Sequence, residues 1–206
     1  MVVVDGFLSD FVTVKSGVPQ GSVIGPIMFI LFVNDILDKL PSSTVSCKLF
    51  ADDVKLYSNV EISTVNSLHD ALALVNAWSI EWQLPINACK CNVPHLKPDL
   101  SLPKAQYTIN GLRVVPLSRV RDLGINIDDR LSFGSHIDDI ITKAYQRIAV
   151  LFRGFCTKTR TFLMHAYKTY VRPVLEYCTQ IWSPYLIKDI NALEKVQKYF
   201  TKKSLV

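Results

Sequence analysis

The chain lacks the patterns that mark fibrous, low-complexity and membrane-spanning proteins. Its 206 residues include 8 Gly and 10 Pro, too few for a collagen-like or low-complexity chain. The longest apolar run, residues 27–33, is much shorter than the roughly 18 residues that a membrane helix needs, so no membrane partner is expected. With 49% hydrophobic and 20% charged residues, the composition instead predicts a globular protein with a real core.

The sequence also lacks a secretory leader and a disulfide framework. The first residues hold no basic segment followed by a long apolar stretch, which predicts an intracellular, reducing location, with nucleus and cytoplasm unresolved. The 5 cysteines are odd in number and scattered. Cys89 and Cys91, with His95 nearby, offer zinc ligands, but a single Cys-x-Cys pair favours three unrelated residues.

Positive charge is concentrated in the last third of the chain. Residues 1–133 hold 11 Lys and Arg against 13 Asp and Glu, a net −2, whereas residues 134–206 hold 12 against 5, a net +7, which together give the +5 of the chain. Binding to a polyanion would require such a basic segment, because Lys and Arg neutralise phosphates and release counterions. A solvated basic helix face explains the same charges.

Periodicity and turn residues predict mixed structure up to residue 133. A weak strand over 11–15 enters the turn-rich segment 16–22, and a helix with Pro26 in its first turn follows, buried on most sides and ended by Pro41. Two β-prone runs, 45–49 and 54–57, predict a hairpin with its bend at 50–53.

Further along, a helix is expected over residues 64–82, followed by a hairpin at Asn110-Gly111 and a strand over 122–127. After Gly134 the apolar spacing is helical throughout, with Ser135 and Asp138 as a capping pair. We therefore predict an α+β domain over residues 1–133 and an all-helical, basic domain over residues 134–206. The three tryptophans fit core positions better than base-stacking positions.

The sharpest chemical feature is the pair Asp52-Asp53 at the predicted bend. A polar turn is the ordinary explanation for two adjacent aspartates. Two carboxylates on a rigid bend can also direct oxygens at one point, where Mg²⁺ takes oxygen ligands together with substrate phosphates. Two such ions would stabilise the attacking and leaving oxygens of a phosphoryl displacement, which is the chemistry of nucleotidyl transfer.

Several motifs, taken in order, resemble one family. They are SGVPQGS at 16–22, Gly25-Pro26, Asn34-Asp35, Phe50-Ala51-Asp52-Asp53, Trp78 and Trp82, Asn87, Lys90-Cys91, DLG at 122–124, LSF at 131–133, VRPVLEY at 171–177, WSP at 182–184 and LEKVQ at 193–197. Together they resemble the reverse transcriptases of non-LTR (LINE-type) retrotransposons, in the jockey and chicken-repeat-like branch. The resemblance covers essentially the whole chain.

The resemblance implies a right-hand polymerase, with a partial palm at 1–133 and a thumb at 134–206, that copies an RNA template from a DNA primer with deoxynucleoside triphosphates. Asp52 and Asp53 would be the catalytic residues that hold two Mg²⁺ ions. Phe50 stands where most reverse transcriptases have tyrosine, and this replacement is familiar in the branch. Pro19, Gln20 and Gly21 would lie beside the templating base and the incoming nucleotide.

Other roles follow from the same resemblance. Lys90 would contact phosphate or the pyrophosphate leaving group, although a solvent-facing lysine is equally consistent with the sequence. Residues 107–133 would include a hairpin that grips the primer end, which a packed β element explains equally well. Phosphate contacts are expected collectively from the thumb cations Lys143, Arg147, Arg153, Lys158, Arg160, Lys195 and Lys198.

One departure from the family concerns the active site. The family has a third carboxylate on a palm strand tens of residues before the SGVPQG motif, and neither Asp5 nor Asp10 matches it. The fingers are missing as well. Two interpretations are open. The chain is either a C-terminal polymerase fragment that is inactive unless the missing N-terminal segment acts as its partner, or a non-catalytic retrotransposon remnant that can only bind nucleic acid. In both cases removal of the fingers should expose apolar palm surface.

Overall fold

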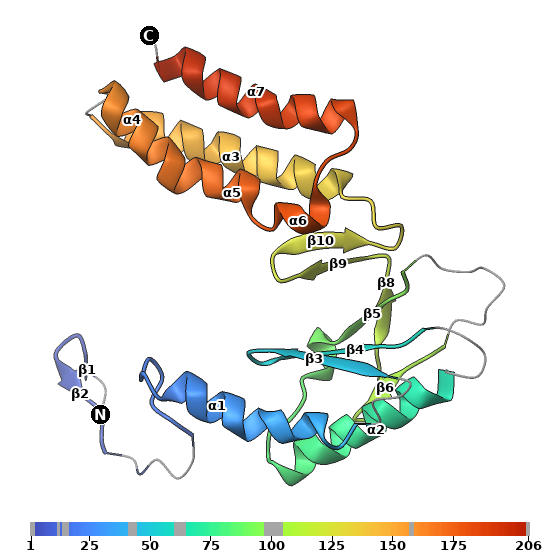
Figure 1. Cartoon of the computed structure of the whole chain (residues 1–206). Helices are drawn as coiled ribbons and strands as arrows, with labels where there is room; N and C mark the ends of the chain where they lie inside the picture. Colours follow the sequence, from blue (N-terminus) through green and yellow to red (C-terminus); the bar gives the residue numbers. More distant parts are fainter. Residues whose placement is uncertain are drawn as a thin grey trace. The chain divides into compact units, whose positions relative to one another are not determined.

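The computed structural model describes residues 3–11, 13, 17–40, 45–59, 65–96, 105–156 and 159–204 (Figure 1). The chain divides into two compact units: Met1–Cys89 with Leu102–Arg113, and Lys90–Ser101 with Val114–Val206. Both helices and small, mostly antiparallel strand pairs are present, which confirms the α+β class. The boundary near residue 133 between a palm and a thumb stays a prediction.

The first unit begins with a short hairpin of β1 (Val3–Val4) and β2 (Phe7–Leu8). Asp5 and Gly6 form its turn with φ values of 49° and 83°, and an Asp-Gly pair is a strong signal for such a turn. The prediction of a strand over residues 11–15 is wrong at Phe11 and Thr13, which belong to no strand. The other three residues lie outside the described part of the chain.

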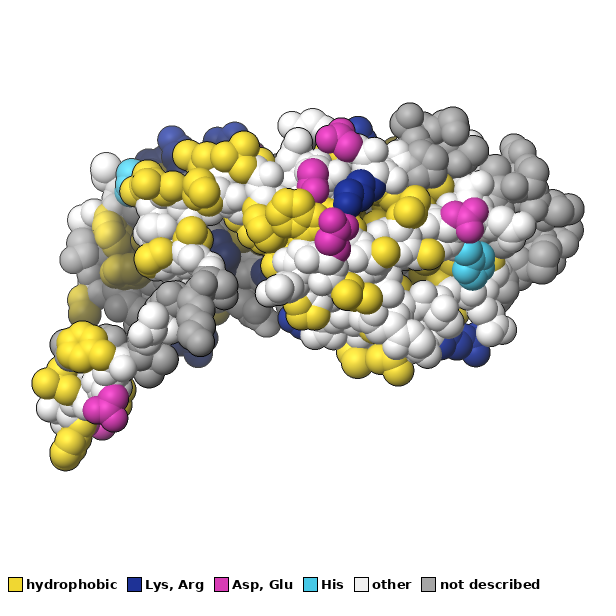
Figure 2. Space-filling model, turned by 90° about the horizontal axis from the view of Figure 1, so that it is seen from below, with side chains coloured by type: hydrophobic (Ala, Val, Ile, Leu, Met, Phe, Trp, Pro, Cys, Tyr) yellow, Lys and Arg dark blue, Asp and Glu magenta, His cyan; other side chains and the backbone are white. Residues whose placement is uncertain are grey.

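Helix α1 spans Gly25–Val33 and continues into a 3₁₀ turn, η1 (Asn34–Leu37). Its start at Gly25-Pro26 confirms the predicted helix, because proline at the first turn needs no N–H partner. The expectation that it is buried on most sides is wrong. Ile30 is 61% exposed and Leu31 67% exposed, and Figure 2 shows hydrophobic side chains gathered on the face seen from below.

A hairpin and a long helix complete the core of this unit. Strands β3 (Ser46–Phe50) and β4 (Asp53–Tyr57) pair antiparallel, as predicted. Helix α2 (Val65–Glu81) packs its apolar face into the same cluster. Trp78 is 5% exposed and lies in this cluster, which confirms its core position. The members of the cluster are Val33, Ile36, Leu40, Val45, Ala71, Val75 and Trp78, with Phe29, Cys47, Leu49, Leu56, Leu68, Trp82, Leu84 and Ile86 packed around them.

The predicted hairpin at Asn110-Gly111 is confirmed as β6 (Thr108–Ile109) and β7 (Leu112–Arg113). Both turn residues have positive φ, 53° and 76°, as a two-residue hairpin turn of this kind requires. The buried ring of Tyr107, at the entry to this hairpin, lies 4.8 Å from His69 of α2.

The second unit contains two strand pairs. Along the chain, the first unit passes into the second within the 3₁₀ turn η2 (Ala88–Lys90). Strand β5 (Asn92–Pro94) then pairs in parallel with β8 (Val115–Leu117). The single strand expected over 122–127 is instead a hairpin of β9 (Arg119–Asp122) and β10 (Ile125–Asp128). Leu123 and Gly124, at φ 44° and 89°, turn the chain there.

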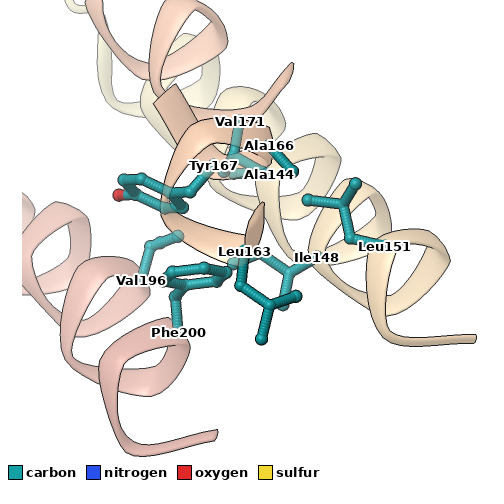
Figure 3. Packing of buried hydrophobic residues seen from close by; sticks show 9 residues of the cluster. All are labelled: Ala144, Ile148, Leu151, Leu163, Ala166, Tyr167, Val171, Val196 and Phe200. Atoms are coloured by element: carbon teal, nitrogen blue, oxygen red, sulfur yellow. The ribbon is translucent and has the colours of Figure 1, made fainter. Parts of the chain in front are cut away.

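The helical character after Gly134 is confirmed. The helices are α3 (Gly134–Gly154), α4 (Arg160–Ala166), α5 (Arg172–Glu176), α6 (Thr179–Trp182) and α7 (Ile187–Ser204). Their main cluster brings together α3, α4 and α7 (Figure 3). A second cluster joins β10, α3 and α6 around Trp182, which is 1% exposed, so this tryptophan also has the expected core position.

Two local features of these helices differ from expectation. The residue before the first turn of α3 is Phe133 and makes no side-chain cap, so the predicted Ser135–Asp138 capping pair does not form. Between α4 and α5 lies a π-helical turn, η3 (Tyr167–Val171), in which the Arg172 N–H bonds to the Tyr167 carbonyl. Pro173 has no N–H to donate to a carbonyl of the preceding turn, which accounts for the local change from α-helical to π-helical hydrogen bonding. Among the described residues, no helix is both long and apolar enough to span a bilayer.

Candidate functional site

The Asp52-Asp53 pair lies at a two-residue hairpin turn. Phe50 and Asp53 are the last paired residues of β3 and β4, so Ala51 and Asp52 alone form the loop. Ala51 has φ 51°, a value that L-residues rarely adopt and that costs about 1–2 kcal/mol. Both aspartates are exposed, so their carboxylates are available to a ligand.

The core holds this turn in place. Cys47 and Leu49 of β3, and Leu56 of β4, pack against the buried cluster of the first unit. Because side chains alternate along a strand, this packing fixes which face of the hairpin is buried and which is exposed. A hairpin of two strands alone is marginally stable in water, so the cluster supplies the rigidity that the turn requires.

The segment before α1 forms a second tight turn. Gly17 and Gly21 have φ values of 85° and 82°. The Ser22 N–H donates to the Pro19 carbonyl at 3.1 Å, and the Ser22 hydroxyl accepts from the Gly25 N–H at 3.1 Å. A Cβ at Gly25 would lie 2.9 Å from Ser22 Oγ, so this position accepts only glycine without rearrangement.

The candidate nucleotide-contacting residues Pro19, Gln20 and Gly21 are all exposed in this turn. Ser16, the first residue of the motif, lies outside the described residues. The turn and the Asp52-Asp53 hairpin belong to the same compact unit, with Phe50 60% exposed beside the aspartates.

Asp35 of the Asn34-Asp35 motif has a structural partner. Its carboxylate accepts a hydrogen bond of 2.9 Å from the indole N–H of the buried Trp78. This bond joins η1 to α2 and satisfies a donor that would otherwise be buried unpaired. Spacing along the sequence could not reveal it, since 43 residues separate the two partners.

The donor set fits magnesium only in part. Carboxylate oxygens are the ligands that Mg²⁺ takes in proteins, commonly one or two carboxylates with water and substrate phosphates completing the shell. Asp52 and Asp53 supply two such groups. Within the part of the chain that the structure describes, no three side chains of His, Cys, Asp or Glu come together as a metal site. Cys89, Cys91 and His95 therefore form no such group either.

The remaining candidate cations lie in the second unit. Lys90 is exposed at the end of η2 and stands in a different unit from the aspartates, so the structure leaves its predicted role open. Lys158 lies outside the described residues. All of the other candidate cations are exposed: Lys143, Arg147, Arg153, Arg160, Lys195 and Lys198.

Two of these arginines already make hydrogen bonds. Arg147 donates to the Tyr170 carbonyl in the π-helical turn at 2.6 Å, and Arg153 Nε donates to the Ala149 carbonyl at 3.3 Å. Each guanidinium has five N–H donors, so capacity for phosphate remains. Their roles as phosphate contacts stay predictions.

The β9–β10 hairpin carries two cations that the sequence interpretation missed. Arg119 and Arg121 are exposed and alternate with Val120, and the opposite face of the hairpin packs against the Trp182 cluster through Ile125 and Ile127. The alternation of arginine with an apolar residue was the signal for an outward basic face.

The turn of this hairpin is hydrogen-bonded to Tyr177, the residue that follows α5. The Tyr177 hydroxyl donates to the Leu123 carbonyl at 3.1 Å, and its ring closes over Gly124.

Comparison with known proteins identifies the family. The family model for reverse transcriptase (RNA-dependent DNA polymerase) matches residues 3–127. Similar curated proteins include the RNA-directed DNA polymerase from mobile element jockey of Drosophila melanogaster, 27% identical over 95% of this chain. The probable RNA-directed DNA polymerase from transposon BS of the same organism is 29% identical over 89%. A Pol polyprotein from the type-1 retrotransposable element R1 2 of Nasonia vitripennis is 26% identical over 89%.

The chain spans only part of the length of each of these relatives. The chain spans 22% of the jockey protein, 21% of the BS protein and 48% of the R1 protein. No solved structure matches the chain. The resemblance to non-LTR retrotransposon polymerases is nonetheless confirmed by these relatives, and the chain belongs to the reverse transcriptase family.

Proposed function

We propose that this chain is the part of a non-LTR retrotransposon reverse transcriptase that carries the Asp52-Asp53 catalytic pair and the primer-holding thumb. The observation that supports it best is the geometry of the β3–β4 turn. Asp52 lies in a strained two-residue turn and Asp53 follows it as the first residue of β4. Both side chains are exposed, and a buried cluster holds the turn in place. Such a turn presents carboxylates at one fixed point, as nucleotidyl transfer requires.

In this proposal Asp52 and Asp53 hold the two Mg²⁺ ions of the reaction. When bound, the ions would lower the energy of the charge that develops on the transferring phosphoryl group. The contribution of the chain is to hold the two carboxylates rigidly, because a displacement of about 1 Å can reduce the rate on the order of a hundredfold. Phe50 and the turn of Pro19, Gln20 and Gly21 would contact the base pair that forms.

The thumb cations would hold the primer–template duplex. The helices of the second unit present exposed lysines and arginines on α3, α4 and α7. Neutralising phosphates releases counterions, so this binding should weaken steeply as salt rises. Lys90 would contact the triphosphate or the pyrophosphate that leaves.

Catalysis by the chain alone is not expected. Two Mg²⁺ ions carry four positive charges, and no third carboxylate joins Asp52 and Asp53 among the described residues. In this proposal, a further carboxylate and a fingers segment would come from a partner of this chain. Without it, nucleic-acid binding is the activity that remains, which is also the alternative function of a non-catalytic remnant.

The proposal is tested by primer extension on a poly(A) RNA template with Mg²⁺, together with duplex binding. The 206-residue chain is compared with D52A/D53A and with D70A, which removes an exposed carboxylate from α2 as a matched control. We expect salt-sensitive duplex binding by all three proteins and extension by none. If the wild-type chain and D70A extended the primer and D52A/D53A did not, the catalytic assignment of the two aspartates would stand and the expected inactivity of the chain alone would be wrong. Absence of duplex binding would overturn the proposed function.

A further inference from the structure

One face of the β9–β10 hairpin is basic. Arg119 and Arg121 are both exposed and lie two residues apart on β9, so their side chains leave the same face of the ribbon. The register places Asn126 opposite Arg121 and Asp128 opposite Arg119 on that face. The other face packs against the Trp182 cluster, so the arginine face is the one that a ligand can reach.

Helix α3 continues this basic surface. Asp139, Lys143 and Arg147 recur every four residues, and residues at this spacing lie on one side of a helix. The side-chain amide of Asn126 donates a hydrogen bond of 2.6 Å to the Asp139 carboxylate, which joins the hairpin to the start of this row. From there the row leads along α3 to Lys143 and then to Arg147, which are both exposed.

A buried histidine indicates that cations of the two elements lie near each other. His136 of α3 accepts a hydrogen bond of 3.4 Å from the backbone N–H of Asn126, so its ring lies at the contact between hairpin and helix. Burial lowers the pKa of His136, and the positive charges of Lys143 and Arg121 lower it further. Asp139 opposes them. Both cations are therefore close enough to this ring to act on its charge.

The fold holds the hairpin against the helices. The Tyr177 hydroxyl donates to the Leu123 carbonyl at 3.1 Å, and the indole of the buried Trp182 donates to the Tyr177 carbonyl at 2.8 Å. Ile125 and Ile127 pack into the Trp182 cluster from the hairpin side. Because these contacts fix the two basic rows relative to each other before a ligand binds, less conformational freedom is lost on binding.

The charge balance of this surface is positive. The Asp139 carboxylate, which adjoins it, already accepts a hydrogen bond from Asn126. The Asp128 carboxylate accepts from the backbone N–H groups of Arg130 and Ser132, at 3.1 and 2.6 Å. The four cations of the two rows outnumber these two carboxylates, so the surface attracts an anion.

The spacing of the cations suits a polymer of phosphates. Residues two apart on a strand are separated by about 7 Å, and residues four apart on a helix by about 6 Å along its axis. A nucleic-acid strand rises by about 3.4 Å per phosphate along the helix axis. Each row therefore matches phosphates that are about two nucleotides apart.

The residue types also favour nucleic acid. All of the cations except Lys143 are arginines, whose planar fork of N–H groups binds phosphate through paired hydrogen bonds. At the far end of the α3 row, Arg147 donates to the Tyr170 carbonyl at 2.6 Å, and the Tyr170 side chain is 55% exposed. An exposed ring next to cations offers a surface on which bases stack.

We propose that one strand of a primer–template duplex binds by its phosphates along a continuous basic track whose cations are Arg119, Arg121, Lys143 and Arg147. This inference rests on the proposed function, which makes nucleic acid the ligand of the second unit. It goes further by joining the hairpin and α3 into one site. The strand would cross the hydrogen bond between Asn126 and Asp139 and continue toward Tyr170.

The first test measures how salt affects binding of a fluorescent RNA-template, DNA-primer duplex by the full chain. R119A/R121A is compared with R119K/R121K, which keeps both charges. K39A/R172A is the matched control, because it also removes two cations, each already paired outside the track: Lys39 with Glu81 at 2.8 Å and Arg172 with Glu176 at 2.6 Å. Circular dichroism melting establishes that each variant is folded.

A second readout locates the bound strand. Nuclear magnetic resonance follows the titration of the His136 ring with and without the duplex, and His136→Asn identifies its signal. Phosphates on the track bring negative charge near the ring, which favours its protonated form, so the duplex should raise the pKa of His136 in the wild-type chain. The rise should be smaller in R119A/R121A.

We expect the slope of log affinity against log salt to fall in magnitude by about two in R119A/R121A, one for each lost phosphate contact. R119K/R121K and K39A/R172A should keep the wild-type slope. An unchanged slope in R119A/R121A, or an equal fall in K39A/R172A, would overturn the track and leave the proposed function standing.

The histidine readout separates a continuous track from scattered contacts. If the wild-type chain bound the duplex and the pKa of His136 did not rise, the strand would not cross the contact between hairpin and helix, and the track would be overturned. Absence of duplex binding by the wild-type chain would overturn both this inference and the proposed function.

Discussion

At the scale of single residues, the backbone at Ala51 is the feature most closely connected with the candidate active site. A positive φ of 51° places its Cβ close to backbone atoms, which disfavours L-residues by about 1–2 kcal/mol. The strain persists because the flanking strands are paired and packed. The sequence predicts the bend here, but a φ value of this kind depends on the register of the hairpin, which residue types alone do not set.

Replacement of Ala51 with glycine should relieve this strain. Glycine adopts positive φ without steric conflict, although its greater freedom in the unfolded chain offsets part of the gain. We expect Ala51→Gly to raise the free energy of unfolding by up to about 1 kcal/mol, measured by urea denaturation. Ala51→Val, whose branched Cβ is incompatible with positive φ, should lower it. Equal destabilisation by both substitutions would contradict strain at this position.

A buried histidine should make the second unit sensitive to acid. His136 is 3% exposed, its ring lies 5.4 Å from Trp182, and its Nδ1 accepts a hydrogen bond from the Asn126 N–H at 3.4 Å. Burial lowers the pKa of His136 below 6.5, the cations Lys143 and Arg121 lower it further, and Asp139 opposes them. Protonation would also remove the acceptor on Nδ1.

The direction of the pH effect follows from linkage. Because the pKa is lowered on folding, the unfolded chain binds more protons below pH 6.5. The stability contribution is complete above pH 6.5 and is lost as the pH falls from 6.5 toward the lower folded pKa. His136→Asn keeps an acceptor near Nδ1 but does not titrate, so thermal melting of this variant should depend less on pH than wild type. The control His165→Gln changes an exposed histidine and should keep the pH dependence of the wild-type melting temperature. If His165→Gln weakened that pH dependence and His136→Asn did not, His136 would be excluded as the group responsible.

At the scale of secondary structure, Asp35 joins two elements that the sequence predicts separately. The 3₁₀ turn η1 and helix α2 meet through the 2.9 Å bond between Asp35 and the Trp78 indole. Asp35→Ala would leave that N–H buried without a partner, and we expect a loss of about 1–3 kcal/mol in the free energy of unfolding. Asp35→Asn retains a carbonyl acceptor and should lose less. Urea denaturation compares the three proteins, and equal losses in both variants would exclude this bond as the cause.

Prediction at this scale succeeded where local signals are strong. The helix after Gly25-Pro26, the Asn110-Gly111 hairpin and the long helix from Gly134 follow from residue types at short range. The sequence does not predict features that tertiary contacts decide, such as the π-helical turn Tyr167–Val171 and the parallel pairing of β5 with β8. The Asp52-Asp53 turn was predictable because its motif is local. The pairing of Lys48 with Lys55 was not predictable, because it depends on the register of the hairpin.

At the scale of the whole molecule, the first unit exposes large apolar side chains along helix α1. Helix α1 contains no charged or hydroxyl side chain, and Ile27, Ile30 and Leu31 are each more than half exposed. The prediction that the chain exposes apolar palm surface agrees with this exposure, while the palm assignment itself stays a prediction. Large exposed apolar patches mark surfaces that bind other proteins or cause aggregation.

We therefore expect the isolated chain to self-associate at micromolar concentration in size-exclusion chromatography. The substitutions I27E/L31K place a favourable charge pair one helical turn apart on α1 and should shift the protein toward monomer. T142E/Q146K introduces the same pattern on the exposed polar face of α3 and should leave the association unchanged. A monodisperse wild-type monomer would contradict this prediction.

The most direct test of the metal-binding role is a titration with Mn²⁺, which replaces Mg²⁺ at oxygen sites and is detected by electron paramagnetic resonance. Asp52 and Asp53 are the carboxylates assigned to the cations, so the wild-type chain should bind Mn²⁺, and primer–template duplex with a deoxynucleoside triphosphate should tighten the binding. D52A/D53A should lose this site, whereas D70A should retain it. Equal Mn²⁺ binding by D52A/D53A and the wild-type chain would contradict the assignment of these two aspartates as metal ligands.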